Sequence, residues 1–129
     1  MKNGGLQTWL VFDEIRVVPG VGASVAGRVL IDLPLFASHF PLRPVVPGVL
    51  LVAGLGEVAA RYLSETTGGQ FRLQALEAAK FRRYVGPDAD VRLEVAARGA
   101  RAFSATVTAG GAPAVTVRTL TMSPARGVS

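Results

Sequence analysis

One uninterrupted apolar stretch with helical spacing limits the folds that this chain can adopt. Residues 45–56 hold no charged side chain, and the first charges on the expected helix are Glu57 and Arg61. This stretch is well short of the roughly 20 residues that cross a bilayer, so a buried core helix is the better interpretation. Because a helix that is apolar nearly all round must be enclosed, we expect the rest of the fold to cover its N-terminal half.

The segment before this helix contains prolines at positions 34, 41, 44 and 47. Proline cannot donate a backbone hydrogen bond and excludes regular helix or central strand, so residues 32–47 are expected to form an ordered loop. Pro47 suits the first position of a helix, where its missing N–H and fixed φ do no harm. We expect the helix to continue to about Leu63 and the Thr-Thr-Gly-Gly segment at 66–69 to end it.

Most of the remaining chain alternates apolar and polar side chains, which is typical of antiparallel strands. The alternation is clearest at 91–95 and 103–108. Strands are expected at 15–18, 24–31, 73–81, 91–98, 101–108 and 114–122, separated by turns that contain glycine or proline. The economical way to bury one apolar helix is to wrap such a sheet around it. The sequence therefore predicts one α+β domain over 1–129 with a hotdog fold, an antiparallel sheet of about six strands around one long central helix, and a frayed tail at about 123–129.

Composition excludes several classes of site. The chain has no cysteine and only one histidine, His39, so disulfides, thiolate chemistry and a metal site are not expected, and no cofactor is implied. The absence of cysteine fits a cytoplasmic protein, and no signal peptide is apparent. A net charge of +5 favours an acidic partner. Since no reading helix is recognisable, we expect an acidic carrier protein rather than nucleic acid, and no membrane association.

Residues 36–50, FASHFPLRPVVPGVL, resemble the signature of the 3-hydroxyacyl-[acyl carrier protein] dehydratases, a hotdog family, and KFRR at 80–83 looks like that family's strand-end motif. The resemblance implies dehydration of a 3-hydroxyacyl thioester, carried by acyl carrier protein or coenzyme A, to a trans-2-enoyl product. It also implies a dimer, in which a histidine from one chain meets a carboxylate from the helix of the other. A homodimer, a trimer of dimers and a heterodimer with an active homologue are the assemblies considered.

The resemblance assigns the catalytic histidine to His39 and the contact with the thioester oxygen to the backbone N–H of Gly48, with Phe40 and Pro47 beside the substrate. The chemistry of these residues is suitable. An imidazole titrates near neutrality and can remove a proton from carbon, and the first N–H groups of a helix stabilise an oxyanion. The alternative for His39 is a structural, hydrogen-bonded histidine in a loop stiffened by proline.

The family's helix carboxylate has no counterpart at its usual place. The position fourteen residues after His39 is Ala53, which cannot transfer a proton and would only line the substrate site. Glu57 lies one turn later, about 6 Å along the axis, and is the candidate for a displaced acid. Alternatively, Glu57, Arg61 and Glu65 form a solvated row with ordinary helix ion pairs.

Four basic residues are candidates for binding the carrier. Arg43 is the cation of the loop and suits a phosphate of a pantetheine arm, although a solvated arginine is the alternative. Lys80, Arg82 and Arg83 form a compact group that suits docking of an acidic carrier protein, or else simply a solvated strand end. In place of the proline common after this motif, the chain has Tyr84.

Three functions therefore remain open. The leading hypothesis is dehydration of a 3-hydroxyacyl thioester, with His39 as base and the acid unassigned. The second is a non-catalytic acyl-binding or partner subunit of a heteromeric dehydratase. The third is thioester hydrolysis, against which Ala53 also counts, because an activated water usually needs a carboxylate.

Overall fold

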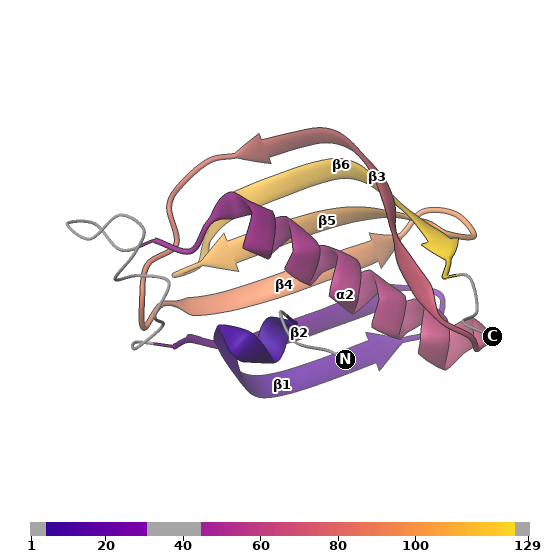
Figure 1. The fold of residues 1–129 in the computed structure, drawn as a ribbon, viewed down its shortest axis with the longest axis horizontal. Helices are drawn as coiled ribbons and strands as arrows, with labels where there is room; N and C mark the ends of the chain where they lie inside the picture. The colour runs from indigo at the N-terminus through magenta and orange to yellow at the C-terminus, as the bar shows by residue number, and fades with distance from the viewer. Residues whose placement is uncertain (1–4, 31–44, 126–129) are drawn as a thin grey trace.

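The computed structural model describes residues 5–30 and 45–125, in which one long helix lies against one six-stranded antiparallel sheet (Figure 1). The strand order is β1-β2-β4-β5-β6-β3, which leaves β1 and β3 at the edges. The expected α+β architecture of six strands and one central helix is confirmed. In chain order the elements are the 3-10 helix η1 (Leu6–Thr8), β1 (Leu10–Val18), β2 (Gly22–Val29), α2 (Gly48–Thr67), β3 (Phe71–Phe81), β4 (Asp90–Ala97), β5 (Ala102–Ala109) and β6 (Ala112–Pro124).

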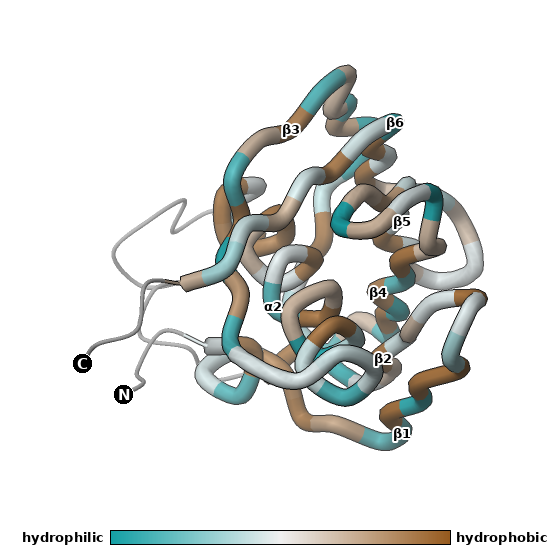
Figure 2. The backbone as a smooth tube through the Cα atoms, turned by 90° about the vertical axis from the view of Figure 1, so that its right-hand side faces the viewer, coloured by the Kyte–Doolittle hydropathy of each residue, from teal (hydrophilic) through white to brown (hydrophobic). Residues whose placement is uncertain are grey.

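The hydrophobic core lies between α2 and the inner face of the curved sheet (Figure 2). Alternate residues of β4 and β5 point toward the helix, as their sequence pattern predicts, and are at most 4% exposed: Val91, Leu93, Val95, Phe103, Ala105 and Val107. Opposite them, Leu55, Val58 and Ala59 of α2 are at most 1% exposed. Burying a Val or Leu side chain stabilises a fold by roughly 1.5–3 kcal/mol, so this interface fixes the helix on the sheet.

Tyr62 joins the C-terminal half of α2 to two other parts of the fold. Its ring meets that of Phe103 edge to face, with centroids 5.6 Å apart. Its hydroxyl oxygen accepts a hydrogen bond of 2.8 Å from the backbone N–H of Gly20, in the turn between β1 and β2. A buried tyrosine is thereby satisfied at its polar end, and the hairpin is held against the helix.

The N-terminal region differs from its sequence-based prediction. β1 begins at Leu10, five residues before the predicted strand, and η1 was not expected. The reason is a β-bulge, because the pairing with β2 shifts between Phe12 and Glu14 and leaves Asp13 as the extra residue. A bulge breaks the alternation from which a strand is recognised in sequence.

The ends of α2 and β6 also lie beyond their predicted positions. α2 continues to Thr67, where the hydroxyls of Thr66 and Thr67 donate to carbonyl oxygens one turn back, and Gly68 follows with φ of 82°. β6 continues through Pro124, which pairs with Phe71. The expectation of a frayed tail is therefore wrong for residues 123 and 124, while residues 126–129 lie outside the described part.

The expectation that the N-terminal half of α2 is enclosed is wrong for one side of the helix. Leu51 and Leu55 are buried on the side that faces the sheet, whereas Val49 is 73% exposed and Ala53 is also exposed. The sheet of a single chain covers only the side of the helix that faces it. Among the described residues, no helix has both the length and the apolar character to cross a membrane.

Candidate functional site

The start of α2 is fixed by one backbone hydrogen bond to a distant segment. The N–H of Val46 donates to the carbonyl oxygen of Val85 at 2.7 Å, and both side chains are buried. Pro47 is the N-cap residue and not, as predicted, the first residue of the helix. α2 therefore begins one residue later, at Gly48. The first N–H groups of a helix have no intrahelical acceptor, and within residues 5–30 and 45–125 those of Gly48 and Val49 have no other acceptor, which makes them available to a ligand.

The strand-end segment 81–85 lies beside this helix start. The N–H of Arg82 donates to the carbonyl oxygen of Ala114 at 2.7 Å, which fixes the chain where it leaves β3. The ring of Phe81 lies so close to Gly48 that a Cβ atom built on Gly48 would be 2.7 Å from Cε1 of the ring. Glycine at position 48 therefore permits contact between the helix backbone and an aromatic ring.

A pocket of about 620 Å³ opens between these two segments, and its lining is mostly apolar. Three of its residues are unusually exposed for apolar or aromatic side chains: Val49 at 73%, Phe81 at 58% and Tyr84 at 74%. An exposed apolar group of this kind, rimmed by polar residues, is typical of a binding site. The described residues that line the pocket are Val46, Gly48, Val49, Leu51, Phe81, Arg82, Arg83, Tyr84 and Val85.

The charge of the described lining is entirely positive. Arg82 and Arg83 contribute two guanidinium groups and no lining residue is acidic. The Nε of Arg82 donates to Oγ1 of Thr116 at 3.1 Å, which holds this side chain along β6 and leaves its charge unpaired among the described residues. The electrostatics of the pocket mouth therefore favour an anionic ligand or partner.

The structure brings together only some of the predicted site residues. Gly48, Arg82 and Arg83 line one pocket, and Pro47 caps the helix beside it. Lys80 is exposed on β3 opposite Thr116 and is not among the lining residues. The residues predicted in the loop, His39, Phe40 and Arg43, lie outside the described part of the chain.

The helix positions considered for the acid lie on the exposed side of α2 and are absent from the pocket lining. Ala53 is the position to which the resemblance assigns the family's carboxylate. Both oxygens of Glu57 accept from the backbone N–H of Leu6, at 3.2 and 3.1 Å. Arg61 pairs with Glu65 at 3.0 Å, so this part of the alternative row of ion pairs is present, whereas Glu57 binds Leu6 instead of Arg61 among the described residues.

The aromatic part of the pocket was missed at the sequence level. Phe81 belongs to the strand-end motif and Tyr84 replaces a common proline, but neither was predicted as a site residue. The available signal was the place of two aromatic residues on either side of Arg82 and Arg83, directly after a strand. Within the described residues, no group of three acidic, histidine or cysteine side chains is placed to hold a metal ion.

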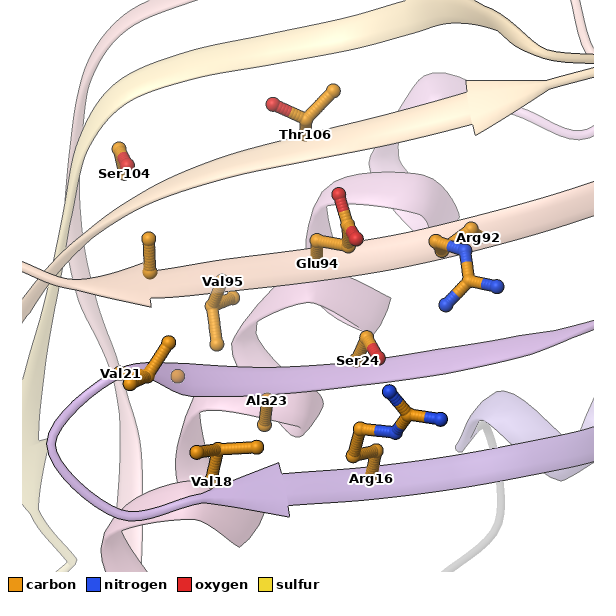
Figure 3. A pocket seen from close by; sticks show the side chains of 12 residues that line it. Arg16, Val18, Val21, Ala23, Ser24, Arg92, Glu94, Val95, Ser104 and Thr106 are labelled. Atoms are coloured by element: carbon orange, nitrogen blue, oxygen red, sulfur yellow. The ribbon is translucent and has the colours of Figure 1, made fainter.

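A second concavity, of about 350 Å³, lies on the outer face of the sheet, away from α2 (Figure 3). Its charged residues are Arg16, Arg92 and Glu94. The guanidinium of Arg16 lies 2.6 Å from a carboxylate oxygen of Glu14, and that of Arg92 lies 3.9 Å from the other. These cations are already partly neutralised by an acidic neighbour, in contrast to those beside Gly48.

Fold and site together define a hotdog protein with an apolar, basic-rimmed pocket at the start of its central helix. The model of the ApeI-like family, described as ApeI dehydratase, matches residues 22–115. The FabZ 3-hydroxyacyl-[acyl-carrier-protein] dehydratase of Rickettsia massiliae (strain Mtu5) is 36% identical over 110 residues, covering 79% of this chain and 76% of the relative. The chain therefore belongs to the ApeI-like dehydratase family, and the resemblance stated from its sequence is confirmed.

Solved structures agree on the fold. The dehydratase heterocomplex ApeI:P from Xenorhabdus doucetiae gives a TM-score of 0.69 at 15% identity, covering 88% of this chain and 96% of that chain. The TT0310 protein from Thermus thermophilus gives 0.61 at 20% identity, covering 89% and 92%. At these identities the likeness concerns the fold alone.

The contact between Gly48 and Phe81 can be tested with a pair of variants. Gly48→Ala alone places a methyl group against the ring, and we expect the exposed ring to turn away with a loss of stability of about 1 kcal/mol or less. Phe81→Ala removes the obstacle, so adding Gly48→Ala to it should no longer lower stability, because alanine at the start of the helix restricts the unfolded chain more than glycine does. Urea unfolding of the four proteins measures this coupling, and equal effects of Gly48→Ala in both backgrounds would refute the contact.

Proposed function

We propose that this chain takes part in the dehydration of 3-hydroxyacyl thioesters to trans-2-enoyl thioesters. The observation that carries the proposal is the start of α2, where the N–H of Gly48, unpaired among the described residues, borders an apolar pocket with arginines at its rim. An acyl chain needs the apolar lining, a thioester carbonyl needs the N–H donor, and an anionic carrier needs the cations. The 36% identical relative named as a 3-hydroxyacyl-[acyl-carrier-protein] dehydratase supports the same reaction.

In this proposal His39 is the general base and Gly48 stabilises the developing charge. His39 removes the proton from C2, and the electron pair moves toward the thioester carbonyl, whose oxygen accepts a hydrogen bond from the N–H of Gly48. The electron pair then forms the C2–C3 double bond as the hydroxyl leaves C3. A proton joins this hydroxyl, so that one water molecule is lost.

The carrier is proposed to approach over the arginine side of the pocket. Arg82 and Arg83 meet the acidic surface of an acyl carrier protein or the phosphates of coenzyme A, with Lys80 farther along β3. Phe40 and Arg43 complete the substrate contacts. The acyl group then occupies the space between Val49, Leu51 and the ring of Phe81.

The proposed assembly is a dimer, for which the exposed Val49 and Ala53 provide apolar surface, and β3, an edge strand of the described sheet, provides backbone hydrogen-bonding groups. A second candidate function is that of a partner subunit in a heteromeric dehydratase. The specific observation in its favour is that Ala53 occupies the usual acid position and that the described pocket lining holds no carboxylate. In such a pair this chain supplies His39 and Gly48, and an active homologue supplies the acid.

The reaction is tested by incubating the purified chain with a 3-hydroxyacyl carrier protein and detecting the enoyl product by mass spectrometry. We expect His39→Ala to reduce turnover about 10²- to 10⁴-fold, since it removes the general base. Turnover that appears only after a carboxylate-bearing homologue is added identifies the partner-subunit function. No turnover in either arrangement would reject both.

The acid position is tested by restoring a carboxylate. If the site retains the geometry of the family, Ala53→Glu should raise turnover at least about 10-fold, because a positioned acid contributes 10²–10⁴-fold in general. Ala53→Gln is the matched control, since it has the same shape and no proton to donate. Equal turnover of the two variants would show that this position does not face the reacting hydroxyl.

The proposed docking surface for the carrier is tested by substituting two arginines that lie in matching environments. Arg82 bonds to the hydroxyl of Thr116 and Arg98 to that of Ser104, at 3.1 and 3.2 Å, but only Arg82 lines the pocket. We expect Arg82→Ala to raise KM for the carrier-bound substrate about 3- to 10-fold and to weaken its salt dependence, with little change for a short pantetheine thioester. Arg98→Ala should leave KM unchanged, and a similar rise for both would argue against a specific docking site.

A further inference from the structure

The N-terminal turn, Gly5–Trp9, packs against α2 at Gly54. A Cβ atom built on Gly54 would lie 2.7 Å from Cδ2 of Leu6, 2.8 Å from Cδ2 of Leu93 and 3.4 Å from the ring of Trp9. Leu6 and Trp9 are 4% and 1% exposed, so this turn contributes two core side chains. Glycine at position 54 is what allows them to reach the helix.

Glu57, one turn after Ala53 and three residues after Gly54, holds the same turn by hydrogen bonding. η1 has no side-chain cap, because its N-cap residue is Gly5. The N–H of Leu6 therefore donates to the carboxylate of Glu57, 51 residues away in sequence, at 3.2 and 3.1 Å from its two oxygens. Gly5 also suits this contact, since a Cβ there would lie 3.1 Å from Oε1 of Glu57.

We propose that Glu57 is a positioning residue, which fastens the N-terminal turn Gly5–Trp9 to α2, and that it is not the acid of the proposed reaction. The first part stands on the contacts with Leu6, and the second rests on the proposed function. The carboxylate is engaged with a backbone donor on the exposed side of α2, outside the described pocket lining. Proton transfer needs hydrogen-bond reach of the substrate, whereas both oxygens of Glu57 accept from the Leu6 N–H and so direct the carboxylate to the N-terminal turn of its own chain.

The contact between Glu57 and Leu6 affects the candidate site because Glu57 lies on the same helix, α2, as Gly48 does. Gly48 lies six residues before Gly54, roughly 9 Å along the axis of α2. The N-terminal turn packs against the helix at Gly54, where Leu93 of β4 also contacts it. Together with the hydrogen bond to Glu57, this packing holds the helix in its position on the sheet. Loss of the contact loosens the turn and, with it, the position of the helix start that carries the oxyanion donor.

Substitution of Glu57 by glutamine and by alanine distinguishes a positioning role from the role of the acid. The side-chain oxygen of Glu57→Gln still accepts from Leu6 but cannot donate a carboxylic proton, whereas Glu57→Ala loses both functions. We expect Glu57→Ala to lower Tm by about 3–6 °C and to speed hydrogen exchange of the Leu6 amide, and Glu57→Gln to restore most of both. Turnover of Glu57→Gln should stay within about 3-fold of the parent, in the homodimer or in the heteromer, whichever is active.

Glu65→Ala is the matched control, because it removes an exposed carboxylate of the same helix that pairs only with Arg61. It should change Tm by less than about 2 °C and leave exchange of the Leu6 amide unaffected. If Glu57→Gln loses as much stability as Glu57→Ala and exchanges equally fast at Leu6, the fastening role is overturned. If Glu57→Gln keeps its stability but loses turnover at least 100-fold, Glu57 is the acid. Absence of turnover in the parent protein, both alone and with a carboxylate-bearing homologue, would reject the proposed function but not the fastening role, which melting and exchange still decide.

Discussion

The close approach of α2 to its neighbours is the constraint on which the rest of this structure depends. Gly48, Gly54 and Gly56 each face a neighbour that lies 2.7–3.2 Å from where a Cβ atom would be. Glycine inside a helix costs roughly 0.5–1 kcal/mol relative to alanine. This cost is offset by packing, because the absence of a Cβ atom lets Phe81, Leu6 and Leu73 contact the helix backbone directly.

The position of the candidate site follows from this approach. At Gly48 the helix has just begun and its first N–H groups have no intrahelical acceptor, so close contact there places hydrogen-bond donors beside whatever fills the neighbouring pocket. At Gly54 the same closeness only brings in core side chains. The bond between Val46 and Val85 then fixes the helix start relative to the strand end, and it brings two segments that are far apart in sequence into one pocket.

The parts of this arrangement that are encoded locally could be predicted from sequence. Alternation identified the strands around Leu93 and Phe103, and the absence of charge at 45–56 identified the core helix. The start of β1 could not be predicted, because the bulge at Asp13 interrupts the pattern. The exposure of Val49 was also missed, since it depends on how much of the helix one curved sheet covers. In the site, Gly48 and the arginines were recognised from family-like spacing, while the packing of Phe81 over Gly48 depends on tertiary geometry. The assignment to His39 stays a prediction.

A displacement of one helical turn changes what a carboxylate on α2 can do. Position 53 lies on the exposed side of α2, one turn after Val49, and both residues expose apolar side chains. Position 57 lies beside the N-terminal turn, where a backbone N–H without another partner needs an acceptor. In the proposed dimer a carboxylate at position 53 would face the partner and its substrate, whereas the carboxylate at position 57 binds the backbone of its own chain. Because this sequence has Ala53 and Glu57, its helix uses its only acidic group near the site for stability. If Glu57 is a positioning residue, as we propose, the proton donor of the proposed dehydration is a group other than Glu57.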